Sequence, residues 1–227
     1  MKRKRTKGVH IRRRLPTVLT RDEIKRFKEQ PKLEEKYYKE ELKRKTREGS
    51  RWLKRTKNKI FNAQRNNAIL KLFYSSGIRL SELVNLDLED IELKEGQIKV
   101  LGKGRKESYC PMTDEAIQAL RGYLNARKAK RNVKGNALFI SRTGERTKKR
   151  DIQRMVPYYA KKAEITKRIS PHSLRHTIAT HLLDRGMNLR YVQSFLRHAD
   201  ISSTQIYTHV STRRLREELA YRHPDNF

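Results

Sequence analysis

The residues with the clearest potential for chemistry are histidines and an arginine in the last third of the chain. Five of the seven histidines fall between positions 172 and 209, namely His172, His176, His181, His198 and His209. His172 and Arg175 follow Ser170-Pro171, a pair typical of a helix start, so both side chains should share one helix face. An imidazole and a cation beside the free N–H groups of a helix N-terminus suit an anion, and phosphate is the expected one in so basic a chain.

Two other interpretations of these histidines are open. They could form a buried polar cluster, and we expect such a structural role for those other than His172 and His198. His172 and His176 also have the spacing of two zinc ligands on a helix. However, Ser173 stands where zinc hydrolases need a glutamate base, and Arg175 would lie close to the dication. We therefore expect no metal site.

The composition points to a polyanionic partner. The 227 residues include 56 Lys or Arg against 25 Asp or Glu, a formal charge of +31, while 35% hydrophobic residues suffice for a folded core. The sequence has no apolar run long enough to span a membrane and no secretory signal, so we expect no membrane association. One cysteine excludes a disulfide framework and fits a reducing compartment, so the expected location is the cytoplasm, with nucleic acid as partner.

The positive charge is concentrated near the N-terminus. Residues 1–59 hold 24 Lys or Arg and 8 Asp or Glu, and residues 2–14 hold eight basic side chains and no acid. This stretch could be a solvated basic tail, or an arm that orders on the DNA backbone. We predict two regions: a basic arm with a charged helical segment over 1–59, and a globular domain over 60–227.

The expected fold class is mainly α with a small antiparallel β-sheet (α+β). A capping box at Thr20–Glu23 predicts a helix that ends before Pro31. Residues 32–58 are predicted to form an exposed charged helix that breaks at Gly49-Ser50. Strands are predicted at 97–101 and 106–111, joined by a glycine turn, and at 137–141. Further helices are predicted over 62–75, 81–86, 149–163 (with a kink at Pro157), 172–185, 188–196, 202–208 and 212–221, with a long one after Thr113.

Five motifs occur in an order and spacing that resemble the catalytic domain of the tyrosine site-specific recombinases, the Xer and phage integrase family. The resemblance covers roughly residues 60–222. The motifs are Ser76-Gly77-Ile78-Arg79-Leu80-Ser81-Glu82-Leu83, Gly102-Lys103-Gly104, His172-Ser173-Leu174-Arg175-His176, Leu196-Arg197-His198 and Ile206-Tyr207-Thr208-His209.

The resemblance implies a set of residues that hold the scissile phosphate. Arg79 and Arg175 look like the two arginines that bind its non-bridging oxygens, and His198 matches the second phosphate-contacting position. Planar guanidiniums suit this role because each binds two oxygens and stays charged. Glu82 matches a supporting acid that orients its neighbours. Taken alone, Arg79 could also be no more than a helix-start salt bridge to Glu82.

The resemblance also implies the residues that react. Tyr207 matches the nucleophile, His172 the histidine placed for proton transfer near it, and Lys103 the general acid for the leaving 5′ oxygen. A phenol with a pKa of about 10 is a poor nucleophile at neutral pH, so it needs a nearby base or a strong positive potential. The phosphotyrosine bond keeps the energy for rejoining, so no metal, nucleotide or other cofactor is expected.

The activity implied is strand cleavage and rejoining of double-stranded DNA through a 3′-phosphotyrosyl link and a Holliday junction. A homo-tetramer on two DNA sites is expected, with a monomer as the alternative state without DNA. The helix over 212–221 is expected to dock on a neighbouring protomer. Two alternatives are a type IB topoisomerase, which uses a similar set of residues, and a non-catalytic DNA- or RNA-binding protein.

Three features depart from the family pattern. Arg197 stands where the family often has glycine, which could alter a turn or add a phosphate contact. Cys110 is expected to be a small packing residue. The separate N-terminal helical domain of the family is not recognisable in residues 1–59, so the chain is either a fragment or a member of a short, single-domain subgroup.

Overall fold

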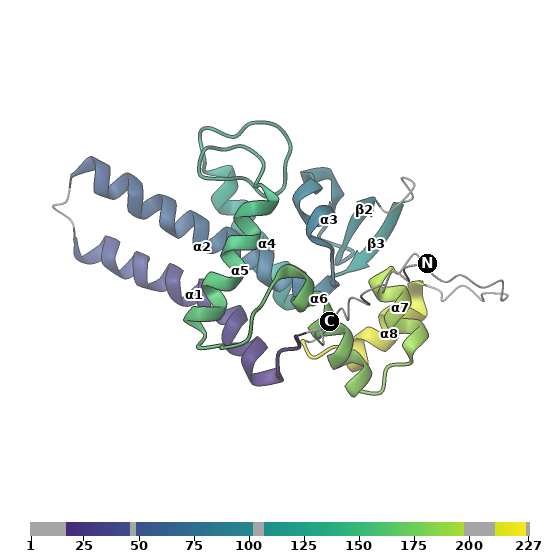
Figure 1. The fold of residues 1–227 in the computed structure, drawn as a ribbon. Helices are drawn as coiled ribbons and strands as arrows, with labels where there is room; N and C mark the ends of the chain where they lie inside the picture. The colour runs from purple at the N-terminus through teal and green to yellow at the C-terminus, as the bar shows by residue number, and fades with distance from the viewer. Residues whose placement is uncertain (1–16, 46–48, 102–106, 198–211, 226–227) are drawn as a thin grey trace, which may run out of the picture.

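The computed structural model of the protein describes residues 17–45, 49–101, 107–197 and 212–225. Within these ranges the chain forms eight α-helices, a single 3-10 turn and one three-stranded antiparallel sheet (Figure 1). The predicted fold class, mainly α with a small antiparallel sheet, is confirmed. The basic stretch over residues 2–14, the glycine turn and the helix predicted over 202–208 lie outside the described residues.

Helix α1 (Arg21–Arg44) begins where the capping box predicts. The Thr20 hydroxyl accepts from the Glu23 N–H at 3.2 Å, and the Glu23 carboxylate accepts from the Thr20 N–H at 2.7 Å. The prediction that the helix ends before Pro31 is wrong. Pro31 is buried on the same side as Ile24 and Phe27, and α1 packs against both α2 and α5. This packing outweighs the one backbone hydrogen bond that a proline removes.

Helix α2 (Ser50–Ser76) is the central helix, and it packs against α1, α4 and α6. Its inner half, from Asn66 onward, is almost entirely buried, while its outer half forms with α1 an antiparallel hairpin that projects from the body (Figure 1). The helix begins at Ser50 rather than at residue 62, so the predicted boundary between residues 59 and 60 falls inside it. It ends at Gly77, which has a left-handed backbone with φ +56°.

The sheet follows a short helix, α3 (Leu80–Asn85), and the 3-10 turn. Its strands lie in the order β1 (Ile91–Glu92), β2 (Gln97–Leu101), β3 (Glu107–Pro111), so the predicted hairpin is confirmed and a third, short strand is added. Cys110 on β3 is fully buried, and burial raises the pKa of its thiol to about 12, as expected for a packing residue.

Helix α4 (Asp114–Lys128) is capped by Thr113 and organises the loop that follows it. The strand predicted at 137–141 is wrong, because this segment makes only isolated bridges, one of them between Asp87 and Ala137. The buried Tyr123 hydroxyl supplies two of the hydrogen bonds that a neighbouring strand would otherwise make. It donates to the Leu138 carbonyl at 3.0 Å and accepts from the Ile140 N–H at 2.9 Å.

Four helices complete the described chain: α5 (Lys149–Lys162), α6 (Pro171–Asp184), α7 (Leu189–Leu196) and α8 (Thr212–Arg222). Each lies within one residue of its predicted limits. In this single chain α8 packs on α7 and buries Leu215 and Leu219, whereas Tyr221 is 81% exposed.

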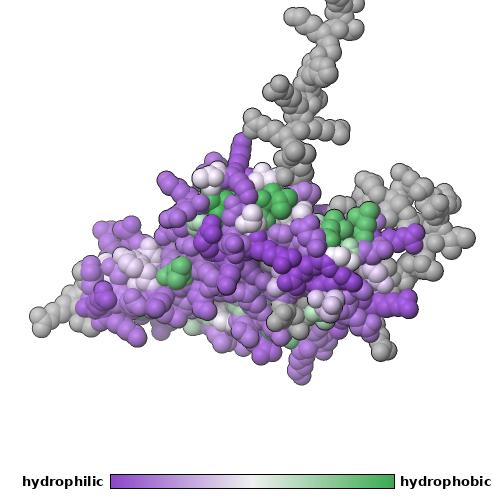
Figure 2. Space-filling view, turned by 90° about the horizontal axis from the view of Figure 1, so that it is seen from below, coloured by the Kyte–Doolittle hydropathy of each residue, from purple (hydrophilic) through white to green (hydrophobic). Residues whose placement is uncertain are grey.

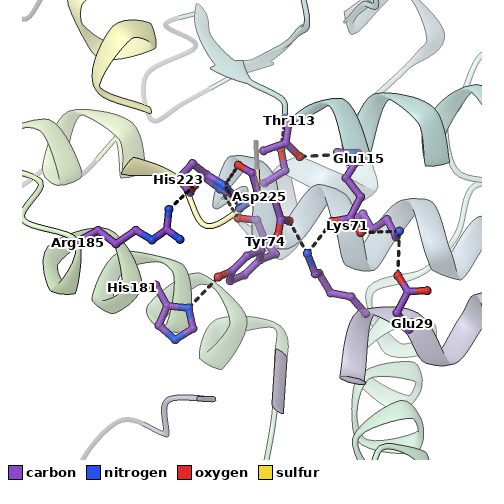
Figure 3. Close-up of polar contacts among 12 residues, drawn as sticks. Glu29, Lys71, Tyr74, Thr113, Glu115, His181, Arg185, His223 and Asp225 are labelled. Atoms are coloured by element: carbon purple, nitrogen blue, oxygen red, sulfur yellow. Dashed lines mark hydrogen bonds and ion pairs between the residues drawn. The ribbon is translucent and has the colours of Figure 1, made fainter. Parts of the chain in front are cut away.

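A buried polar cluster ties the C-terminal segment to α1, α2 and α4 (Figure 3). Lys71 lies 2.8 Å from one oxygen of Glu115, and Lys28 lies 2.6 Å from the other and also contacts Asp225. Burial alone would raise the pKa of Glu115, but the two ammonium groups hold it at about 2. Burial raises the pKa of Asp225 to about 6. The carboxylates therefore neutralise cations that the core would otherwise not accept.

Histidines beside this cluster serve the fold. His181 is buried, and its two ring nitrogens lie 2.7 Å from the Tyr74 hydroxyl and 2.8 Å from the Leu19 carbonyl. His223 packs edge-on to the Tyr74 ring, and burial lowers the pKa of its imidazole to about 4. Both act as structural residues that join distant segments.

The surface is strongly hydrophilic. Figure 2 shows hydrophilic residues over most of the face seen from below, with apolar residues only in small separate groups. Among the described helices, none is both long enough and apolar enough to cross a membrane.

Gly77 generates the first prediction. A Cβ atom at this position would lie 2.9 Å from Leu196 Cδ2 and 3.2 Å from Phe195 Cε1, in a backbone conformation that side chains avoid. We expect Gly77→Ala to lower the free energy of unfolding by about 2–4 kcal/mol, measured by chemical denaturation. Gly122→Ala is the matched control, since Gly122 lies in α4 with open space around it. It should stabilise by about 0.5–1 kcal/mol, and equal effects of the two variants would contradict the prediction.

Candidate active site

A pocket of about 610 Å³ lies where the N-terminal ends of α3, α5 and α6 meet. Three of the predicted site residues, Arg79, His172 and Arg175, line it. The remaining lining residues are Ile78, Leu80, Ser81, Lys149, Gln153, Ser170 and Pro171. The structure therefore brings together side chains that lie almost 100 positions apart in the sequence.

Arg175 is the buried cation of this pocket, at 6% exposure. It extends from α6, and its guanidinium donates to the backbone carbonyls of Gly77 and Leu196, which end α2 and α7. Burial, followed by the proximity of Arg79 and Arg197, lowers the pKa of Arg175 to about 10, so the group stays charged at neutral pH. A guanidinium has five N–H donors, so the two carbonyl bonds leave others available for a ligand.

Arg79 is held at the start of α3 by Glu82. The Arg79 guanidinium donates to Glu82 Oε1 at 2.7 Å, and its backbone N–H donates to Glu82 Oε2 at 2.9 Å. The simple alternative, a helix-start salt bridge, is therefore present. The Arg79 side chain is still 38% exposed and lines the pocket, so the ion pair orients the cation without closing it off.

Arg197 plays a part that the sequence did not indicate. It ends α7 in the left-handed region, with φ +52°, which explains why glycine suits this position in the family. Its guanidinium donates to Glu82 Oε2 at 2.9 Å, and its backbone carbonyl accepts from Arg79 at 2.8 Å. Arg197 thus joins the end of α7 to the start of α3. Its position beside His198 in the sequence was the only clue to this role.

Glu82 is consequently shared between two arginines. Its side chain is only 6% exposed, and burial alone would raise the pKa of its carboxyl. The charge of Arg197 and the hydrogen bonds from Arg79 and Arg197 outweigh burial and lower the pKa below its usual value. The carboxylate is therefore ionised at neutral pH and can orient both cations.

His172 is exposed in the first turn of α6, beside Arg175. Ser170 caps this helix, with its hydroxyl accepting from the Ser173 N–H at 3.3 Å, and Pro171 occupies the first position. The predicted helix start and the shared face are confirmed. Lys149 and Gln153 of α5 also line the pocket and were missed, although the run Lys148-Lys149-Arg150 marks a basic helix start.

The other predicted site residues, Lys103, His198 and Tyr207, lie outside the described residues. So does His209. In the parts of the chain that the structure describes, no group of three or more His, Cys, Asp or Glu side chains is arranged to hold a metal ion.

The fold and this pocket define a class of protein: a helical domain in which two fixed guanidiniums and a histidine at a helix start line one pocket, an arrangement suited to an anion such as phosphate. The phage integrase family profile matches residues 47–214, which is most of the chain. The protein therefore belongs to the phage integrase family of tyrosine recombinases, and the resemblance seen in the sequence is confirmed.

Curated relatives place it near the Xer branch of that family. The chain is 49% identical over 169 residues to tyrosine recombinase XerC of Thermodesulfovibrio yellowstonii, an alignment that covers 72% of this chain and 56% of the relative. It is 42% identical over 165 residues to tyrosine recombinase XerD of Staphylococcus saprophyticus, again with 72% and 56% coverage. The chain thus spans little more than half the length of these relatives.

Solved structures of Xer recombinases have a similar fold. The XerA recombinase matches with a TM-score of 0.64 and 32% identity, covering 94% of this chain and 67% of that one. The XerH recombinase, solved as a post-cleavage complex on a palindromic difH substrate, matches with a TM-score of 0.64 and 25% identity, covering 91% and 53%.

The shared carboxylate generates the second prediction. We expect Glu82→Gln to lower the free energy of unfolding by about 2–4 kcal/mol at pH 7, because two guanidiniums lose their counter-charge. Since the folded pKa of Glu82 lies below the unfolded one, this stabilisation is complete above about pH 4.5 and is lost as pH falls through the folded pKa. The difference between wild type and variant should therefore shrink in acid, as measured by urea titrations at several pH values.

The exposed Glu145, which pairs with Lys134 on the surface, provides the matched control. Glu145→Gln should change stability by less than about 0.5 kcal/mol. A Glu82→Gln effect that is independent of pH would show that the carboxylate charge is not what stabilises the site.

Proposed function

We propose that this chain catalyses site-specific recombination of double-stranded DNA as a tyrosine recombinase. The observation that carries the proposal is the pair of fixed guanidiniums, Arg79 and Arg175, which line one pocket with His172 in a member of this family. Displacement at phosphorus places negative charge on the non-bridging oxygens, and cations fixed in advance stabilise that charge without reorganising.

In the proposed reaction the Tyr207 hydroxyl oxygen attacks the scissile phosphorus, and the bond to the 5′ oxygen breaks. The phenolic proton passes to a base, the role that we assign to His172. Lys103 donates a proton to the leaving oxygen. The products are a 3′-phosphotyrosyl bond and a free 5′-hydroxyl, and attack by the 5′-hydroxyl of a partner strand reverses the steps and regenerates Tyr207.

Two further residues support the phosphate. We assign His198 to a hydrogen bond with a non-bridging oxygen, as its place in the family motif implies. Glu82 acts as a positioning residue, since it binds the guanidiniums of Arg79 and Arg197 rather than any part of the substrate. The chemistry that we propose uses side chains alone and draws no energy from a nucleotide.

The proposed assembly is a homo-tetramer on two DNA sites, in the cytoplasm. XerH was solved on a palindromic DNA, and two-fold symmetric sites suit paired protomers. In such an assembly we propose that α8, with its apolar Leu215 and Leu219, docks on a neighbouring protomer instead of on its own α7.

The third prediction concerns the nucleophile. We expect the wild-type chain to form a covalent adduct with nicked duplexes taken from the DNA that flanks its own gene, and Tyr207→Phe to form none. Adducts are measured on denaturing gels. Tyr37→Phe is the matched control, because Tyr37 is 56% exposed on α1, away from both the pocket and α8, and this variant should keep wild-type yield. Adduct formation by Tyr207→Phe would refute the assignment. If the protein formed adducts with any duplex, and relaxed plasmids without joining two sites, a topoisomerase would be favoured.

The fourth prediction concerns the general acid. We expect Lys103→Ala to slow cleavage by about 10²–10⁴-fold. A substrate with sulfur in place of the bridging 5′ oxygen should restore most of the rate, because a thiolate leaves without a proton at a thiol pKa of about 8.5. Arg79→Ala should be slow on both substrates. Equal rescue of the two variants, measured as single-turnover rates, would contradict the role of Lys103.

A further inference from the structure

A second pocket, of about 420 Å³, lies on the outer half of α2, where the helical hairpin leaves the body of the protein. It is lined on one side by α2 and on the other by the loop between α4 and α5. We call it the hairpin groove. Its lining residues are Arg51, Lys54, Arg55, Asn58, Lys59, Asn62 and Arg142.

The charge of the hairpin groove is one-sided. Five of its seven lining residues are cationic and none is acidic. Within the described part of the chain, Arg51, Lys54, Arg55 and Arg142 form no ion pair. Lys59 lies over the Tyr38 ring at 4.5 Å, a contact that leaves its charge uncompensated.

Further cations lie close to the groove. Lys130 contacts Asn58 at 3.5 Å and lies over the Phe61 ring at 4.4 Å. Burial, with added repulsion from Arg142 and Arg65, lowers the pKa of Lys130. The loop and α2 thus bring like charges together, an arrangement that opposes folding unless an anion occupies it.

The two helices of the hairpin differ in how many acidic residues accompany their basic ones. On α1 the lysines alternate with glutamates, and Lys39 pairs with Glu35 at 2.6 Å. On α2, from Ser50 to Ser76, there is no acidic residue at all. The excess charge of the hairpin therefore lies mainly on α2, the helix that the loop before α5 also approaches.

The shape of the groove favours a polymer over a single anion. Arg51 and Lys59 are separated by about 12 Å along the helix axis. Phosphates on one strand of duplex DNA recur every 3.4 Å or so along the duplex axis, so this length matches about three of them. One small anion would leave most of these cations unpaired.

The groove also connects to the active site through a short piece of chain. Arg142 lines the groove and Lys149 lines the active-site pocket. The stretch between them reaches at most about 25 Å when fully extended, the length of about 7 base pairs. One duplex can therefore contact both places within roughly one helical turn.

From these observations we infer that the hairpin groove binds the sugar-phosphate backbone of duplex DNA, independently of sequence, about one turn from the cleaved phosphate. The inference rests on the proposed function for the identity of the polymer. Contacts of this kind carry no sequence information, but they set affinity and register.

The test compares two triple variants with equal loss of charge. Arg51→Gln, Lys54→Gln and Arg55→Gln together change exposed groove residues, and Lys32→Gln, Lys36→Gln and Lys43→Gln together change exposed residues of α1 that do not line it. Affinity for a duplex of about 40 base pairs is measured against salt concentration. We expect the groove variant to bind about 10- to 100-fold more weakly at 0.1 M salt, with a log–log salt slope shallower by about 3. The α1 variant should keep a slope within about 1 of wild type.

Phosphate ethylation interference locates the contact. Wild type should lose binding when phosphates about one turn from the cleavage position are ethylated, and the groove variant should be insensitive to those ethylations. Equal slopes for the two triple variants, or a groove variant that loses RNA binding while its DNA affinity is unchanged, would overturn the inference. Both assays measure binding and do not require cleavage. A failure to form the covalent adduct would therefore refute the proposed function without affecting the outcome of these two assays.

Discussion

The arrangement of the pocket depends on the hydrogen bonds that the guanidinium of Arg175 makes. It extends from α6 and bonds to the carbonyls of Gly77 and Leu196, so it joins the ends of α2 and α7. Carbonyls at helix C-termini carry partial negative charge and can hold a buried cation. Arg79 follows Gly77 by two residues, and Arg197 follows Leu196 directly. The two hydrogen bonds from Arg175 therefore bring the guanidiniums of Arg79 and Arg197 close to its own.

Three guanidiniums so close together repel one another, and the structure offsets this with a single carboxylate. Glu82 binds both Arg79 and Arg197, while Arg175 relies on neutral carbonyls. One acid among three arginines leaves this cluster beside the pocket with a net positive charge, which suits the charge of a phosphodiester and its transition state. The pKa values of Arg175 and Glu82 are lowered for different reasons. Burial and the neighbouring arginines lower that of Arg175, whereas the charge of Arg197 and the hydrogen bonds from Arg79 and Arg197 lower that of Glu82 in spite of its burial.

The other cationic side chains fall into two groups, which differ in whether they have acidic partners. Lys28 and Lys71 enter the core only with Glu115 and Asp225 as partners, in the cluster that ties the C-terminal segment to three helices (Figure 3). The cations of the hairpin groove meet no acid in the described chain. Buried charges need partners for the fold to be stable, whereas exposed charges stay hydrated without one and can attract an anion.

Local features of the sequence were enough to predict most helix limits, while the resemblance to a family pointed to Arg79, His172 and Arg175, which the structure brings to one pocket. Thr20, Thr113, Ser170 and Gly77 act on neighbouring residues, so their caps and stops are readable without a fold. Two of the errors have a cause in long-range contacts. Packing along α1 carries the helix through Pro31, and the Tyr123 hydroxyl supplies part of the hydrogen bonding of a strand partner at residues 137–141. The sequence determined which groups could bind phosphate; only the tertiary structure decided that Arg197 binds Glu82, because that bond joins residues more than 100 positions apart.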